Sequence, residues 1–318
     1  MHPLAQIALE MGFVQVCAVP AHPFALWAQR LEQTGLAPYV HLSSTPQASF
    51  PVRSIFVAVL PAPPLLPWPQ DCGRVSGFYF TSNPGYQLER RWQQEAARRG
   101  YAVSAGGMPL RAAALRAGMG VCGRNGLLIT PQWGSYVYLA GLMSDVEVPA
   151  LSPEADIPKA CLGCGACARA CPAGAIGPDG IHPTRCLRFL MSQPQQLAPD
   201  RYAAMGDRIL GCETCQRVCP MNRGQRADAP SPAQSAPFSL ERLLTAPDLD
   251  AVAAQIGRNY ARKGRLQLQA ALAAANTGRT DLAAAIRALE DQPYEPLARA
   301  ARWAAARLAQ HAQEEENL

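Results

Sequence analysis

Eleven cysteines are spread unevenly along the chain, and eight of them lie between residues 161 and 219. The first run, CLGCGACARACP at residues 161–172, has the spacing C-x2-C-x2-C-x3-C-P. In this spacing three thiolates hold one 4Fe-4S cube, and the fourth thiolate binds a neighbouring cube. The cysteines therefore predict electron transfer through iron–sulfur clusters.

A second run, CETCQRVCP at residues 212–220, has the spacing C-x2-C-x3-C-P and lacks one cysteine, because Ile209 stands where the first should be. Cys186 is the unassigned cysteine nearby and can supply the missing ligand. We therefore predict two 4Fe-4S clusters. The first cysteine set is Cys161, Cys164, Cys167 and Cys219, and the second cysteine set is Cys171, Cys186, Cys212 and Cys215.

Two other uses of eight cysteines are possible. Two zinc sites with four thiolates each would need the same number, but zinc ribbons favour two well-separated C-x2-C pairs. A disulfide scaffold is typical of oxidising compartments. The run with proline after its last cysteine favours clusters over both alternatives.

The cysteines must be positioned by a longer chain, because 318 residues are enough for two or three modest domains. Apolar spacing predicts a mixed α/β domain over residues 1–155. Its expected helices cover residues 4–12, 24–35, 86–99 and a segment from Pro109, and its expected strands cover 54–60, 101–104, 127–130 and 136–143, the last two paired with each other.

The cysteine region, residues 156–224, is predicted to be a ferredoxin-like double-cluster domain, and the Pro/Ala/Ser-rich residues 225–237 a linker. Residues 238–318 are predicted to be helical, with helices over 270–275, 281–290 and 296–310. The expected fold class is therefore α+β with three parts.

Composition excludes several classes of protein. Apolar residues make up 49% and charged residues 17% of the chain, which excludes a disordered protein, and the formal net charge is only +5. The N-terminal MHPLAQIALEMGF lacks the basic and apolar pattern of a secretory signal. Prolines interrupt the most apolar segment, residues 54–69, so it cannot span a membrane. We expect a cytoplasmic protein with reduced cysteines and no membrane partner.

The order of several motifs resembles that of epoxyqueuosine reductases. The motifs are AGMGVCGRNGLLITPQWGSYVYLAGLMSD, CLGCGACARACPAGAI, RCLRFL and GCETCQRVCPMN, and the tail GRLQLQAALAAANTGRTDLAAAIRALEDQPYEPLARAARWAAARLA is similar to the HEAT-like repeat of that family. The resemblance implies a cobalamin-dependent iron–sulfur reductase that converts epoxyqueuosine to queuosine in tRNA. It also implies a base-off corrinoid between the N-terminal domain and the clusters, nearest the second cysteine set.

The resemblance implies corrinoid contacts for five residues: Tyr86, Arg124, Asn125, Ser135 and Arg188. Arg124, Asn125, Ser135 and Arg188 also have purely structural interpretations. The glycine-rich turn around Arg124 and Asn125 would equally serve a tight helix-to-strand connection. Ser135 could cap a turn, and Arg188 could shield cluster charge.

The chain departs from the family pattern where a catalytic acid is expected. The family's aspartate stretch corresponds here to SAGGMPLRAAALRAGMG, and no acidic residue occurs between Glu95 and Asp145. The family's D-Y-H motif is Gly85-Tyr86-Gln87. Unless water, Tyr86 or another group supplies the proton, epoxide opening has no general acid, and the catalytic residue is left unassigned.

The C-terminal part carries a candidate tRNA contact: Arg258, Arg262, Lys263, Arg265 and Arg279. Such a run could bind phosphates, or it could be a solvated helix end.

The implied electron donor is a low-potential ferredoxin or flavodoxin. Two other functions stay open: a corrinoid and 4Fe-4S reductase acting on a small molecule or on another protein's corrinoid, and a non-enzymatic electron-transfer adapter.

Overall fold

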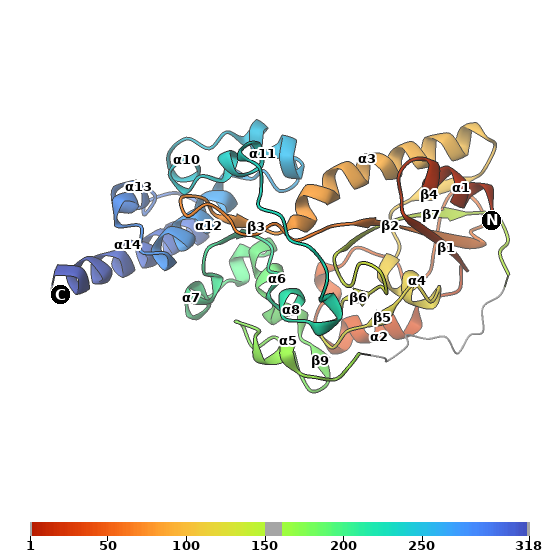
Figure 1. The fold of residues 1–318 in the computed structure, drawn as a ribbon, viewed down its shortest axis with the longest axis horizontal. Helices are drawn as coiled ribbons and strands as arrows, with labels where there is room; N and C mark the ends of the chain where they lie inside the picture. The colour runs from red at the N-terminus through yellow and green to blue at the C-terminus, as the bar shows by residue number, and fades with distance from the viewer. Residues whose placement is uncertain (1, 150–160, 317–318) are drawn as a thin grey trace.

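A computed structural model describes residues 2–149 and 161–316. Its N-terminal part is built on a four-stranded antiparallel sheet with the order β1-β2-β7-β4 (Figure 1). The strands are β1 Gln15–Pro20, β2 Ser54–Pro61, β4 Val103–Ala105 and β7 Val137–Ser144. The helices are α1 Pro3–Glu10, α2 Ala25–Gln33, α3 Gly77–Arg98 and α4 Leu110–Arg116.

Helices cover both faces of this sheet, which explains why β2 reads as a continuous apolar run. Phe56 and Ala58 pack with Trp92 of α3 and with α1 on one face. Ile55 and Val57, the alternate residues, pack with α4 on the other face. The predicted mixture of helices and strands in this part is confirmed.

Two sequence-based expectations for this part are wrong. Residues 127–130 and 136–143 do not form one hairpin, since β6 Leu128–Ile129 pairs with β5 Val121–Cys122, while β7 pairs with β2 and β4. Helix α3 begins at Gly77 rather than at 86, with Pro84 inside it. Packing of the first turns of α3 against the rest of the molecule outweighs the local cost of the proline.

The cysteine region consists of short elements joined by turns. They are α5 Ala166–Arg169, β8 Ile176–Gly177, β9 Gly180–Ile181, α6 Leu187–Ser192, α7 Tyr202–Met205, β10 Arg208–Leu210 and α8 Thr214–Arg217. Strand β10 pairs in parallel with β3 Arg74–Val75, so a segment of the N-terminal part crosses into this region. Arg74 reinforces the crossing through an ion pair with Asp207 at 2.6 Å.

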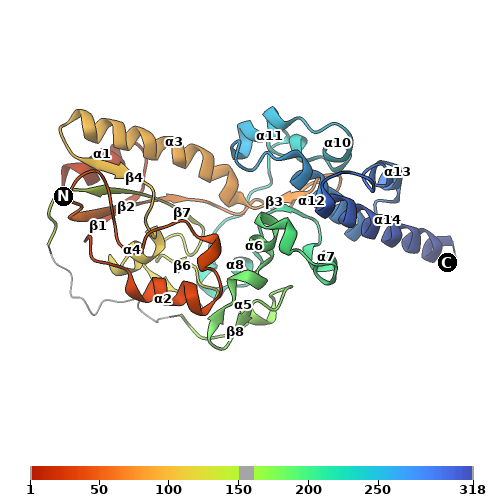
Figure 2. The same ribbon diagram turned by 180° about the vertical axis from the view of Figure 1, so that it is seen from behind.

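The C-terminal part is helical, as predicted, and extends away from the sheet (Figures 1 and 2). Its helices are α9 Pro232–Ser235, α10 Leu240–Thr245, α11 Leu249–Ile256, α12 Lys263–Asn276, α13 Ala283–Arg287 and α14 Glu295–Glu316. One hydrophobic core joins these helices to the cysteine region and to Val75 and Tyr79.

The structure bears on the predicted domain boundaries only in part. The boundary at 155/156 lies outside the described residues. The expected linker 225–237 is not a free connection, since Asp228 pairs with Leu65 and α9 begins with a capping box at Ser231. Among the described residues, no helix is both long and apolar enough to cross a membrane.

Candidate functional site

The first cysteine set gathers around one small pocket. All four of its members line that pocket together with Gly163, Gly165 and Pro220. Three come from the loop and first turn at α5, and Cys219 comes from the end of α8, some fifty residues later. Burial raises the pKa of the Cys167 thiol, and the neighbouring Cys161 and Cys219 thiols raise it further.

The second cysteine set is also brought together, from three separate segments. Burial, followed by the charges of Cys212 and Cys186, raises the pKa of the Cys215 thiol to about 12. Burial likewise raises the pKa of Cys186, with further contributions from Cys212 and Cys171. The backbone N–H of Ala175 donates to Cys171 Sγ at 3.2 Å.

This chemistry suits iron–sulfur clusters. Thiols whose pKa values are raised by burial and by one another become thiolates only beside strong positive charge, which cluster iron supplies. Among the described residues, no three His, Cys, Asp or Glu side chains are close enough to hold a single metal ion. The ligands of a cube bind its separate iron corners rather than one ion.

Asn125 and Arg124 lie at the cysteines. The buried Asn125 side chain lies beside the Cys215 thiol, whose pKa it lowers, and its Oδ1 accepts from the N–H of Leu127 at 3.3 Å. Both residues also line the pocket of the first cysteine set, so Asn125 lies between the two sets. Gly123 is required there, because a Cβ would stand 2.3 Å from Asn125 Oδ1.

Ser135 takes part in a buried network that joins the N-terminal part to the second cysteine run. Its N–H donates to Asn222 Oδ1 at 2.8 Å, and its hydroxyl accepts from Asn222 Nδ2 at 2.9 Å. Gln216 Nε2 donates to the Ser135 carbonyl at 2.8 Å. Gly134 has φ +54°, and a Cβ there would stand 2.0 Å from Asn222 Oδ1. The side chain of Ser135 is thus engaged in hydrogen bonds within the protein, between its N-terminal part and the segment of the second cysteine run.

Arg188 and Tyr86 lie at a group of tyrosines beside the second cysteine set. The tyrosine cluster comprises Tyr79, Tyr86, Tyr138 and Tyr260, which come from α3, β7 and the loop after α11. The Arg188 guanidinium lies 6.0 Å from the centre of the Tyr79 ring, and Tyr260 packs edge-on against that ring at 4.8 Å. Burial raises the pKa of Tyr138, and Glu89, Tyr260 and Tyr86 raise it further.

Sequence reasoning missed two buried carboxyl groups. Glu89, 8% exposed, accepts the N–H of Gly141 at 2.7 Å through Oε1, and burial raises its pKa. Glu213, 4% exposed, accepts the Ser76 hydroxyl through Oε2 at 2.9 Å, while its buried Oε1 has no hydrogen-bond partner among the described residues. A glutamate on a helix or inside a cysteine run gives no sequence signal of burial.

The five residues of the predicted tRNA contact lie in two places in the structure, at the two ends of α12. Arg262, Lys263 and Arg265 are exposed at the start of α12, next to the exposed Arg258, and we call these four residues the basic loop. Arg279 lies apart from the basic loop, and its part in the contact stays a prediction. It follows the far end of α12, about 20 Å away, and its charge is paired with Asp281 at 2.6 Å.

Comparisons with known proteins agree with this geometry. Residues 160–222 match the family model of the 4Fe-4S double cluster binding domain. The chain is 39% identical over 125 residues to the epoxyqueuosine reductase of Bacillus subtilis, a match that covers 39% of the chain but only 31% of the relative.

Solved structures are similar over nearly the whole chain. One is epoxyqueuosine reductase from Bacillus subtilis with an aspartate-bearing catalytic loop swung out of the active site. Another is epoxyqueuosine reductase with an epoxyqueuosine-modified tRNA stem loop. Each has TM-score 0.77 and 23% identity, and covers 98% of this chain and 92% of the other.

The fold and the two cysteine groups define a double 4Fe-4S cluster protein with the fold of epoxyqueuosine reductases. The resemblance found in the sequence is confirmed, because relatives by sequence and by structure are both epoxyqueuosine reductases.

Proposed function

We propose that the protein is a reductase that uses two 4Fe-4S clusters, one on each cysteine set. The observation that carries this proposal is the pocket in which Cys161, Cys164, Cys167 and Cys219 meet. Asn125 supports it, because N–H donors to sulfur stabilise the reduced, more negative form of a cluster. The domain layout predicted from the sequence, including a HEAT-like C-terminal part, belongs to the same proposal.

The cofactor that we propose beside the second cysteine set is cobalamin. Its chemistry would be two-electron reduction at cobalt. The residues present suit such a group, since the half-exposed ring of Tyr86 and the partly exposed ring of Tyr138 offer apolar surface and the exposed Arg188 offers a cation for amide carbonyls or phosphate. Of the five residues predicted to contact it, Tyr86 and Arg188 fit this position best, whereas Asn125 and Ser135 are engaged elsewhere.

The substrate that we propose is epoxyqueuosine in tRNA. The basic loop adjoins the tyrosine cluster, because Tyr260 of the same loop packs on Tyr79. Phosphates bound at Arg258, Arg262, Lys263 and Arg265 would therefore hold an anticodon beside the half-exposed Tyr86. The solved relative with a modified stem loop supports the same class of substrate.

The proton for epoxide opening is assigned to Glu89. Reduction of the epoxide to an alkene consumes two electrons and two protons and releases water. Burial raises the pKa of Glu89, and the Gly141 N–H donates to Oε1, so Oε2 is the oxygen that would carry a proton. Glu89 and Tyr86 both raise the pKa of Tyr138, so the two tyrosines are close neighbours of this carboxyl and would pass the proton on.

The decisive experiment uses anaerobically reconstituted protein with cobalamin, dithionite and tRNA bearing epoxyqueuosine. We expect about eight irons per chain, a base-off cobalamin spectrum and formation of queuosine. The Cys186→Ser variant should retain about four irons. A zinc-loaded, colourless protein, or failure to bind cobalamin, would contradict the proposal. We place the reaction in the cytoplasm, with a ferredoxin or flavodoxin as donor.

A second candidate keeps the cofactors and changes the substrate. The observation that favours it is the lack of any acidic residue between Glu95 and Asp145, whereas the Bacillus subtilis structure has an aspartate on its catalytic loop. Reduction of a small molecule or of another protein's corrinoid would then be the activity. Binding of cobalamin without any queuosine formation would favour this candidate.

A further inference from the structure

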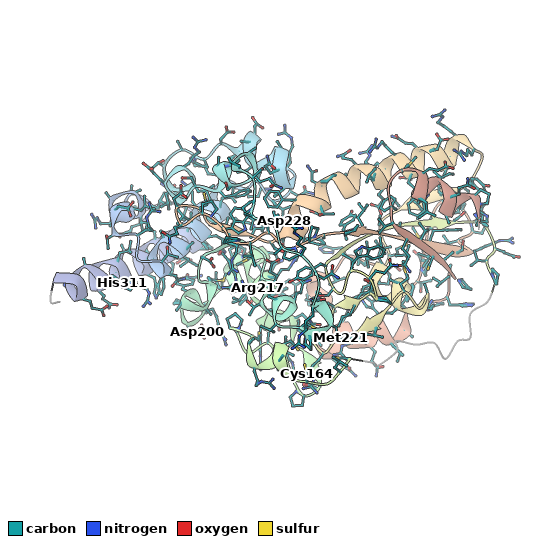
Figure 3. All side chains as sticks on the ribbon, in the orientation of Figure 1. Cys164, Asp200, Arg217, Met221, Asp228 and His311 are labelled. Atoms are coloured by element: carbon teal, nitrogen blue, oxygen red, sulfur yellow. The ribbon has the colours of Figure 1, made fainter. Side chains whose placement is uncertain are left out.

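The surface around the first cysteine set is the most open part of the iron–sulfur region. Cys164 is exposed, and Figure 3 places it at the lower edge of the molecule, far from His311 on α14. Leu162 is 65% exposed and Val218 39% exposed, and each lies next to a cysteine of this set. Two large apolar side chains therefore face solvent directly beside the pocket.

Arginine side chains lie on the same cysteine-bearing segments as these apolar side chains and on the neighbouring turn. Arg169 donates to the Cys164 carbonyl at 3.0 Å, so its charge lies on the cysteine loop. A Cβ at Gly165 would stand 2.9 Å from Arg169 Nη1 and 3.9 Å from Arg124 Nη1, which places both cations at one turn. Arg223 is exposed four residues after Cys219. In the described part of the chain, none of these three arginines forms an ion pair.

Negative charge is absent from the described segments that line the pocket of the first cysteine set. Residues 118–135, 161–177 and 214–227 contain no aspartate or glutamate. A small apolar centre with a rim of one charge sign is the arrangement of a transient interface, in which charge guides encounter and apolar contact sets a short distance.

We propose that this surface docks an acidic, one-electron carrier protein of the ferredoxin class. The inference rests on the proposed function, which it deepens by naming the entry point of electrons. One reduced ferredoxin gives one electron to the cluster on the first cysteine set and leaves oxidised; two such encounters supply the two electrons of one turnover. RNA is the weaker occupant, because the basic loop lies elsewhere, at the start of α12.

The test is anaerobic stopped-flow reduction of the cluster-loaded protein without tRNA. The rate of reduction is measured from the loss of the visible absorption of the clusters. The reductants are a pre-reduced acidic ferredoxin and, separately, dithionite, which needs no docking. The variants are Arg223→Glu and Leu162→Gln, and the matched control is Arg287→Glu, an exposed charge reversal on α13. Iron content is measured for each protein.

We expect Arg223→Glu to slow reduction by ferredoxin about tenfold at low ionic strength and to weaken its salt dependence. Leu162→Gln should slow it at all salt concentrations, while Arg287→Glu and all dithionite rates stay at the wild-type values. The proposal would be overturned if ferredoxin reduced the Arg223→Glu variant as fast as it reduces the wild-type protein. Equal slowing by both reductants would also overturn it, because it would mean that the arginines only balance cluster charge.

The same variants separate this inference from the proposed function. Loss of tRNA binding in Arg223→Glu, with ferredoxin rates unchanged, would identify an RNA interface and overturn the docking proposal alone. Docking can hold even if queuosine never forms, because the readout is cluster reduction. A protein without clusters would overturn both proposals.

Discussion

At the scale of single residues, Asn125 has the most specific environment. It is 3% exposed, lies beside the Cys215 thiol, whose pKa its side chain lowers, and lines the pocket of the first cysteine set. A hydrogen bond to sulfur favours the reduced cluster, because reduction adds negative charge to the sulfurs. Asn125 is therefore placed to adjust the relative potentials of the two clusters.

We expect Asn125→Leu to lower the midpoint potential of the cluster that contains Cys215, with the other cluster changing less. Redox titration followed by spin resonance measures both midpoints. Iron content must match the wild type for the comparison to hold. Unchanged midpoints would show that the Asn125 amide only fixes the backbone at Leu127.

Glu89 predicts a pH dependence of stability. Burial raises its pKa in the folded state, so its contribution is fully present below the unfolded pKa, about 4.3, and is lost as the pH rises through the folded pKa. Glu89→Gln keeps an acceptor for Gly141 and cannot ionise. The melting temperature of the variant, relative to the wild type, should therefore rise as the pH increases above about 4.3. A constant difference would contradict burial of the ionised group.

The same substitution tests the proton assignment. Because a positioned general acid contributes on the order of 100-fold or more, Glu89→Gln should lower queuosine formation by at least that factor and change its pH profile. Cluster reduction by dithionite should be unaffected. Normal turnover would assign Glu89, on α3, a purely structural role as the acceptor for the N–H of Gly141 on β7.

At the scale of elements, a few contacts fix the cysteine runs relative to the sheet. The turn before β7 is joined to α8 through Ser135, Gln216 and Asn222. Strands β3 and β10 join the two regions at a second place. These contacts hold the second cysteine run at the N-terminal end of β7, beside the tyrosine cluster.

Asn222→Ala leaves the Ser135 N–H without its buried acceptor, which costs about 1–3 kcal/mol. We expect a lower melting temperature and faster loss of iron. Asn222→Asp retains the acceptor and is the matched variant, with a smaller expected effect. Equal melting temperatures for Asn222→Ala and the wild type would show that water replaces the network without cost.

At the scale of the whole molecule, cationic surfaces lie in two separate places. One surrounds the first cysteine set, and the other is the basic loop at the start of α12. The second cysteine set and the tyrosine cluster lie between them. Electrons and RNA would thus approach different faces of the protein.

The double variant Arg262→Ala, Lys263→Ala should weaken tRNA binding and reduce the salt slope of its affinity by about 0.7–0.9 per lost phosphate contact. Arg279→Ala is the control, because its charge is already paired with Asp281. Binding is measured by filter retention at several salt concentrations. An equal effect of Arg279→Ala would contradict the division of the predicted surface.

Much of the fold was predictable because its signals are local. Apolar spacing located α1, α2, β2 and α4, and the long helices of the C-terminal part. The start of α3 was not, since Pro84 is a local stop signal that distant packing outweighs. Pairing of 127–130 with 136–143 was wrong because a nearby strand is only one of several partners that a sheet offers.

The spacing of cysteines by itself determined the chemistry, because two or three residues between ligands fix which thiolates can share one cube. Tertiary structure alone decided which side chains lie near one another. It places Asn125 beside Cys215 and Glu89 near Tyr138, and it separates Arg279 from the basic loop. The physical reason is range. Ligand spacing is a property of a short stretch of chain, whereas burial, pKa shifts and charge pairing depend on side chains that only folding brings together.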